Sequence, residues 1–149
     1  MSIERLNLYF DNYFPLDSSE RDVLPTLFVE RKIKRRQFIL QQGAICKHFT
    51  FVVSGCLRMF AIDDNGKEHN IQFIAENDWA MDLSSFYSEK SSKLYIEAIE
   101  PCIVLQIKHD DVLYLYTHFH KFDHNFRVII EQKFIALQER VLQNISSSA

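Results

Sequence analysis

Residues 77–86 (NDWAMDLSSF) hold the side chains with the clearest capacity for ligand chemistry. Asp82, Ser84 and Ser85 offer one carboxylate and two hydroxyls within four residues, and Trp79 offers a flat apolar surface. Such a group can hold a small polar ligand. Asp and Ser can equally cap a helical turn, and Trp79 can equally be a core aromatic residue. The residues alone leave both alternatives open.

Three histidines invite a second interpretation, as metal ligands. His120 and His124 are one helical turn apart, and His118 lies nearby. However, the segment from His118 to His120 is expected in a helical linker, whereas the jelly-roll metal enzymes called cupins carry two histidines one residue apart on a strand. No nucleophile–base pair or metal triad can be assembled from the sequence. We therefore expect no metal, no cofactor and no enzymatic activity, and a cupin-like metal enzyme is the weakest alternative.

Composition limits the class of protein. The chain has 149 residues, of which 47% are apolar, and this suits one domain with one core. With 17 basic and 20 acidic side chains, it lacks the overall positive charge typical of nucleic-acid-binding domains. The one basic run reads best as the exposed face of a strand; it comprises Arg31, Lys32, Lys34, Arg35 and Arg36.

Location and redox state follow from the same sequence. No apolar run approaches the roughly 20 residues that span a bilayer, and the first residues lack a secretory signal. We therefore expect a cytoplasmic protein with no membrane contact. Cys46, Cys56 and Cys102 are far apart and odd in number, which favours free thiols.

The pattern of apolar residues predicts the elements that position these groups. Residues 1–29 carry two helical segments, one ending before Pro15 and one beginning at Ser18-Ser19-Glu20. Residues 30–108 alternate in short β-rich runs, and Asp64-Asn65-Gly66 marks a hairpin. Residues 109–149 return to helical spacing, with a cap expected at His109. The fold class is mainly β with flanking helices, in a jelly-roll or related barrel.

The last helix carries one apolar stripe over about six turns. Its members are Phe122, Phe126, Ile130, Phe134, Leu137, Val141 and Ile145. A small barrel cannot cover that length, so we expect the outer half to meet a copy of itself in a homodimer; the alternative is that it lies on the barrel throughout. The predicted seam comprises Phe126, Ile130, Lys133, Leu137, Val141 and Ile145.

The three turn glycines lie in segments that together resemble a known family. These segments are QGAIC from Gln42, FVVSGCLR from Phe51 and DNGKE from Asp64. They are similar to the cyclic-nucleotide-binding sensor domain of Crp/Fnr-type transcription regulators, over about residues 36–141. The resemblance implies a cyclic-nucleotide-binding-like β-roll (jelly-roll) plus a long C-terminal dimerisation helix. It also implies a ligand-binding cassette formed by Trp79, Met81, Asp82, Leu83, Ser84, Ser85, Ser92 and Lys93, faced by Phe134, Leu137 and Gln138 of the last helix.

The cassette departs from the family pattern at three anchors. Met81 stands where the family has glycine, and Asp82 stands for glutamate. The arginine that neutralises the cyclic phosphate falls near Ser91 or Ser92, with only Lys90 and Lys93 nearby. Methionine crowds the approach of backbone to an anion, and lysine lacks the bidentate grip of a guanidinium. We therefore expect that cyclic AMP and cyclic GMP do not bind in the usual way.

These observations predict one sensor domain over residues 1–149, which acts as a homodimer and responds to an unknown small-molecule effector or to none. In the family a helix-turn-helix domain follows the central helix, but residues 146–149 (SSSA) end the chain without one. We expect the sensor half of a longer regulator, which would reach DNA only through that further domain; a freestanding sensor is the other reading. The alternative function is a degenerate dimerisation or protein-interaction domain that binds no ligand.

Overall fold

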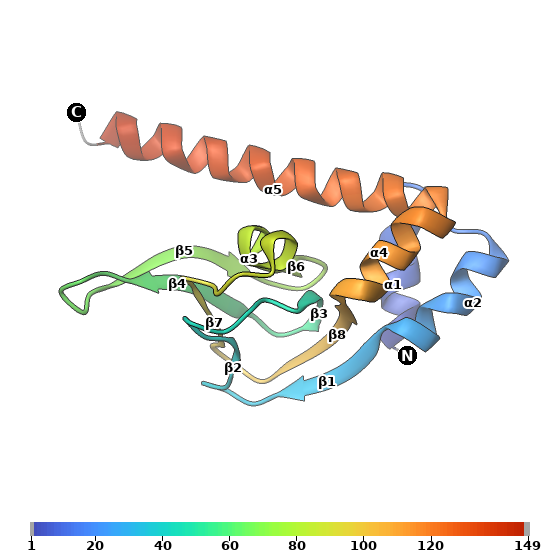
Figure 1. The fold of residues 1–149 in the computed structure, drawn as a ribbon, viewed down its shortest axis with the longest axis horizontal. Helices are drawn as coiled ribbons and strands as arrows, with labels where there is room; N and C mark the ends of the chain where they lie inside the picture. The colour runs from blue at the N-terminus through green and yellow to red at the C-terminus, as the bar shows by residue number, and fades with distance from the viewer. Residues whose placement is uncertain (1, 148–149) are drawn as a thin grey trace.

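The computed structural model describes residues 2–147, which form a β-roll with helices at one end and along one side (Figure 1). The first two helices precede the roll, a short helix interrupts it, and two more follow it. The elements are α1 (Ser2–Asp11), α2 (Ser18–Leu27), β1 (Val29–Ile33), β2 (Phe38–Leu40), β3 (His48–Ser54), β4 (Leu57–Ile62), β5 (Glu68–Ile74), β6 (Trp79–Ala80), α3 (Leu83–Ser88), β7 (Tyr95–Ala98), β8 (Cys102–Lys108), α4 (His109–His118) and α5 (His120–Ser147).

The roll consists of two four-stranded antiparallel sheets. One has the order β1-β8-β3-β6 and the other β2-β7-β4-β5, so strands far apart in sequence pair in both. The predicted hairpin joins β4 to β5: the Asp63 carboxylate accepts hydrogen bonds from the backbone of Asn65 and Lys67, and Gly66 has a φ of 81°. The predicted fold class is therefore confirmed.

Two helices begin where predicted but are capped differently. The N-cap of α2 is Asp17, one residue before the expected Ser18, because Asp17 and Glu20 form a reciprocal capping box. Helix α4 begins at His109 itself, and its N-cap residue, Lys108, makes no side-chain cap hydrogen bond. Asp110 and Asp111 still lie in the first turn, where their negative charges interact favourably with the positive end of the helix dipole.

An aromatic cluster fills the core between the helices and the β1-β8-β3-β6 sheet. Trp79 is only 1% exposed and lies at its centre, with ring centroids 5.1 Å from Phe51 and 6.1 Å from Phe126. Tyr9 and Phe10 of α1 reach the same indole ring. The structure thus places Trp79 in the core, which is the second of the two alternatives that its sequence context allowed.

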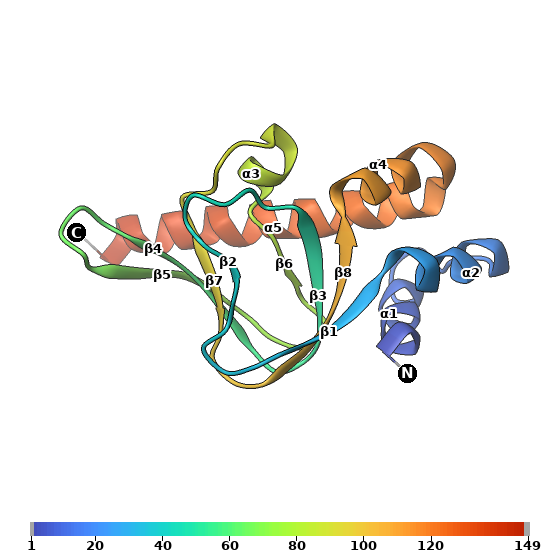
Figure 2. The same cartoon turned by 60° about the horizontal axis from the view of Figure 1, so that its bottom comes forward.

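Helix α5 divides into a buried half and an exposed half. Its first turns pack on the core through Phe122, Phe126 and Ile129, whereas the rest passes alongside α3 and on towards the β4–β5 hairpin (Figures 1 and 2). Each four-residue step of the predicted stripe advances about 40° around an α-helix, since a residue takes about 100°. The stripe therefore turns from the core at Phe122 to solvent at Phe134, which is 64% exposed.

Although α5 has 28 residues, neither it nor any other helix within residues 2–147 is long and apolar enough to cross a bilayer.

Candidate functional site

The cassette is the connection from β6 through α3 to β7, and Asp82 is its central polar residue. Asp82 is the N-cap of α3 and is 8% exposed. One carboxylate oxygen accepts a hydrogen bond from the backbone N–H of Ser85 (3.4 Å), and the other accepts one from the hydroxyl of Ser92 (2.6 Å). Both oxygens are therefore engaged by the cassette itself, as the capping alternative predicts.

Ser85 and Ser92 are structural members of the cassette. Ser85 accepts a hydrogen bond from the backbone N–H of Cys46 (2.9 Å) and donates one to the carbonyl of Lys90 (2.6 Å). Ser92, where the family arginine would stand, is buried and also accepts a hydrogen bond from the backbone N–H of Leu94. Both hydroxyls are used within the protein: Ser85 joins two backbone segments, and Ser92 joins the Asp82 carboxylate to the backbone of Leu94.

A cavity of about 360 Å³ separates the cassette from α5, and we call it the cassette pocket. Met81, Asp82, Leu83, Ser84 and Leu94 of the cassette line one side, with Met59, Ile71 and Gln72 from the roll. Helix α5 supplies Ile130, Lys133, Phe134, Leu137 and Arg140. This volume is in the range of small-molecule sites, and most of the lining is apolar.

The structure brings together only some of the predicted ligand-binding residues. Met81, Asp82, Leu83 and Ser84 meet Phe134 and Leu137 around this pocket. The others do not line it: Trp79 is in the core, Ser85 and Ser92 are engaged within the cassette, and Lys93 and Gln138 are exposed. Gln72 and Arg140 were missed, because only the fold brings β5 and the middle of α5 to the cassette.

The cations of the cassette pocket come from α5. The Lys133 ammonium forms a 2.8 Å ion pair with Asp78, and its side chain is 15% exposed. Burial lowers the pKa of Lys133, while the nearby Asp78 carboxylate acts in the opposite direction. Within the cassette, both lysines, Lys90 and Lys93, are exposed. A cyclic phosphate next to Asp82 would therefore meet a carboxylate with no guanidinium from the cassette to offset it.

Three of the predicted seam residues are exposed, two are partly exposed, and one, Phe126, needs correction. Leu137, Val141 and Ile145 are exposed on the outer half of α5. Phe126 is fully buried in the monomer, Lys133 is held against the roll by Asp78, and Ile130 lines the cassette pocket. Only Phe126 is excluded from a seam, because it packs in the core; by the 100° step Ile130 lies between Leu137 and Val141 around the helix, so it and the partly exposed Lys133 stay predicted seam residues. Ile135 and Leu142 are exposed beside Val141, and the sequence stripe omitted them.

The residues considered for metal binding do not converge. Within residues 2–147 no group of three or more His, Cys, Asp or Glu side chains could hold a metal ion. The His118 ring bonds the Tyr114 carbonyl at 2.9 Å, and the His124 ring packs against Phe14. All three cysteines are free thiols, as predicted.

Comparison with known proteins identifies the architecture. The family model for the cyclic nucleotide-binding domain matches residues 30–119. A search of curated protein sequences found no match.

Solved structures with the same fold include two regulators and one sensor domain. The Thermus thermophilus catabolite activator protein is 21% identical (TM-score 0.73), and the match covers 91% of this chain and 62% of that one. A Eubacterium rectale protein described as a Crp/Fnr-family transcriptional regulator is 18% identical (TM-score 0.73; 89% and 63%). The sensor domain of the Pseudomonas aeruginosa regulator DNR is 13% identical (TM-score 0.69; 93% and 89%). The chain thus spans less than two thirds of the length of the first two.

Proposed function

Because this chain belongs to the cyclic nucleotide-binding domain family, we propose that it is the ligand-sensing and dimerisation domain of a Crp/Fnr-type transcription regulator. One observation carries the proposal: α5 both forms a wall of the cassette pocket and continues into an exposed apolar face. Phe134 and Leu137 belong to both regions. A ligand in the pocket would contact the same helix through which two copies would meet.

The proposed dimer forms through what we call the α5 face. It comprises Phe134, Ile135, Leu137, Val141, Leu142 and Ile145, each of which is about half exposed or more. Since each residue advances about 100° around the helix, these side chains span about 160° of its circumference. This face is wider than the seam of a two-stranded coiled coil, which uses only the a and d positions of each heptad. Large apolar side chains at this density on one helix favour burial against a partner. DNA contact would require a domain outside this chain.

The proposed effector is not a cyclic nucleotide held in the usual way. Met81 fills the place of the glycine, both oxygens of Asp82 are occupied, and Ser92 replaces the arginine. The apolar lining suits a smaller or less polar molecule. We propose that this molecule acts by binding, without catalysis.

Two measurements test the proposal. Isothermal titration of the protein with cyclic AMP and cyclic GMP should give no binding heat, and a micromolar dissociation constant for either would overturn the claim about the cassette. Sedimentation velocity should find the wild-type protein dimeric, with Val141→Glu and Leu142→Glu shifted towards monomer. Gln143→Glu is the matched control, because it adds the same charge on the opposite side of α5. A monomeric wild type, or two dimeric Glu variants, would refute the proposed α5 dimer.

The internal bonding of Asp82 also favours the alternative, a degenerate domain that dimerises without a ligand. The two functions differ in the role of the cassette pocket. If a large panel of small apolar molecules left the amide NMR signals of Leu83, Ser84 and Leu137 unchanged while the protein remained dimeric, the degenerate alternative would replace ligand sensing.

A further inference from the structure

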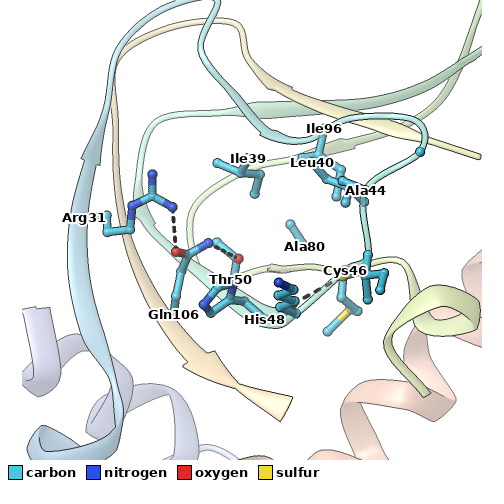
Figure 3. A pocket seen from close by; sticks show the side chains of 14 residues that line it. Arg31, Ile39, Leu40, Ala44, Cys46, His48, Thr50, Ala80, Ile96 and Gln106 are labelled. Atoms are coloured by element: carbon cyan, nitrogen blue, oxygen red, sulfur yellow. Dashed lines mark hydrogen bonds between the residues drawn. The ribbon is translucent and has the colours of Figure 1, made fainter. Parts of the chain in front are cut away.

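A second cavity opens into the interior of the β-roll, on the other side of Met81 from the cassette pocket. We call it the roll cavity; its volume is about 460 Å³ (Figure 3). Arg31, Gln106 and Thr50 lie on one side, and Leu40, Ala44 and Ile96 lie on the other (Figure 3). The family resemblance assigns no ligand to this space, and its chemistry differs from that of the cassette pocket.

The polar side of the roll cavity is a hydrogen-bonded chain across three strands. Thr50 and Gln106 are direct cross-strand partners of β3 and β8, and the Gln106 Nε2 donates to the Thr50 hydroxyl oxygen at 2.9 Å. Arg31 lies on the adjacent strand β1, and its guanidinium donates to the Gln106 Oε1 at 2.9 Å. Gln106 and Thr50 are 4% and 1% exposed, so these hydrogen-bonded side chains are anchored in the core.

The hydrogen bonds among Arg31, Gln106 and Thr50 fix which donors and acceptors face the cavity. A guanidinium only donates, so the amide oxygen of Gln106 must face Arg31, and the amide nitrogen must face Thr50. The Thr50 oxygen then accepts, which leaves its own hydrogen to point elsewhere. Gln106 takes one of the five guanidinium N–H groups. The cavity is thus lined by donors on a cation that a buried amide holds in place.

The charge of the lining has one sign. Arg31 and Lys47 contribute cations, and the lining residues, all of them within residues 2–147, include no Asp or Glu. The pKa of His48 is lowered, first by burial and then by the positive charges of Arg31, Lys108 and Lys47. Arg31 is exposed, as predicted for the basic run, but its guanidinium bonds the buried Gln106 at the lining of the roll cavity. Arg31 shares the inward face of β1 with the buried Ile33, since alternate residues of a strand point the same way.

We propose that the roll cavity binds a small organic carboxylate with an apolar tail. The carboxylate pairs with the Arg31 guanidinium, which offers the bidentate geometry that a carboxylate prefers, and it accepts a hydrogen bond from the Thr50 hydroxyl. The tail lies against Ile39, Leu40, Ile96 and Met81. The apolar walls beside Arg31 suit a carboxylate with an apolar tail better than inorganic phosphate, which has no apolar group to bury against them.

The roll cavity is connected to the cassette through the loop of residues 43–48. The Ser92 N–H donates to the Ala44 carbonyl at 2.7 Å, and the Cys46 N–H donates to Ser85 at 2.9 Å. The Asp82 N–H in turn donates to the Cys46 sulfur at 3.4 Å. A carboxylate that displaces this loop would therefore move α3, so the roll cavity is a second input to the same cassette.

Titration with hexanoate, followed by ¹H–¹⁵N NMR, tests the assignment. The amides of Ala44, Cys46 and Thr50 should shift with a dissociation constant of about 1 mM or tighter, as a probe of so few atoms allows. Hexan-1-ol has the same chain without the charge, and inorganic phosphate has charge without the chain. Both should bind at least about tenfold more weakly. Hexan-1-ol loses a hydrogen bond to a charged group, which contributes about 1.5–3 kcal/mol. Phosphate loses the burial of the apolar chain, which contributes about 0.8 kcal/mol per CH₂.

Two variants and one control locate the site. Arg31→Gln removes the cation. The isosteric Gln106→Glu places an internal carboxylate beside Arg31, which competes with the ligand. Each variant should raise the dissociation constant of hexanoate at least about tenfold. Arg35→Gln is the matched control, because it makes the same substitution at an exposed arginine after β1. The amide spectrum shows whether each variant remains folded. Equal affinity of Arg31→Gln and wild type, equal binding of hexan-1-ol or phosphate, or no binding of hexanoate would each overturn the proposal.

Discussion

Asp82→Ala should lower the free energy of unfolding by about 2–4 kcal/mol, because the carboxylate holds the cassette together. This substitution separates the two roles that Asp82 could have. A carboxylate reserved for a ligand contributes little to the stability of the free protein. A carboxylate that caps α3 and bonds Ser92 contributes in the absence of any ligand.

The magnitude comes from the two hydrogen bonds. The bond from the Ser92 hydroxyl is short (2.6 Å), buried and made to a carboxylate, so its loss should cost about 1.5–3 kcal/mol. The bond from the Ser85 N–H is long (3.4 Å), which puts the cap near the lower end of its usual range, at about 0.5–1 kcal/mol. Ser92 is itself buried, so no bulk water replaces its lost partner.

Urea unfolding at a fixed protein concentration, followed by circular dichroism, measures the effect. A fixed concentration matters because dimerisation would couple stability to concentration. With a slope of about 2 kcal/mol per molar urea, the midpoint should fall by about 1–2 M. Asp64→Ala is the control, since Asp64 is exposed in the β4–β5 turn and should change stability by less than about 0.5 kcal/mol. If the two variants unfold alike, Asp82 is not a structural cap, and its carboxylate would again be a candidate ligand group.

Two further predictions concern Lys133 and the turn glycines. Because burial lowers the Lys133 pKa below its ordinary 10.5, the unfolded chain binds that proton more tightly, so this group makes stability rise as pH increases from the lowered pKa towards 10.5. Lys133→Met should lack that rise, and the difference between the urea midpoints of variant and wild type at several pH values isolates it. Gly55 and Gly43 have nearly equal φ (94° and 93°), but a Cβ at Gly55 would meet the Cys102 sulfur at 2.6 Å, whereas none of the described atoms lies within 4 Å at Gly43. Gly55→Ala should therefore destabilise by several times the roughly 1 kcal/mol expected for Gly43→Ala, and equal thermal midpoints would contradict the steric reason.

The strands were predictable because their signals are local. The predicted change from β-rich to helical spacing after residue 108 coincides with the end of β8 at Lys108. The hairpin at Asn65-Gly66 followed from the backbone angles that glycine allows. The caps of α2 and α4 differed from the prediction because capping depends on single side-chain contacts, which several neighbouring residues can satisfy equally well.

The candidate sites were harder to predict because their residues meet only through the fold. Arg31 reads as one of five surface cations in the sequence. It faces the roll cavity because of its position in the pleat of β1 and because Gln106, 75 residues later, holds it. For Asp82 the sequence left two roles open. Its contact with the Ser85 N–H is local, but its contact with Ser92 forms only because the chain returns to the cassette before β7.

The rotation of α5 explains how one helix can serve both a pocket and a seam. Steps of four residues move the apolar stripe by about 40°, so it passes from the core, across the cassette pocket, to solvent within three turns. Phe134 stands at the crossing: it lines the pocket and is 64% exposed on the α5 face. A ligand and a partner helix would therefore share one side chain. Since any binding that repositions Phe134 for one would change its contacts with the other, the proposed ligand binding and dimerisation would be coupled in both directions. A strict a/d heptad would hold the seam on one side of the helix and leave pocket and partner independent.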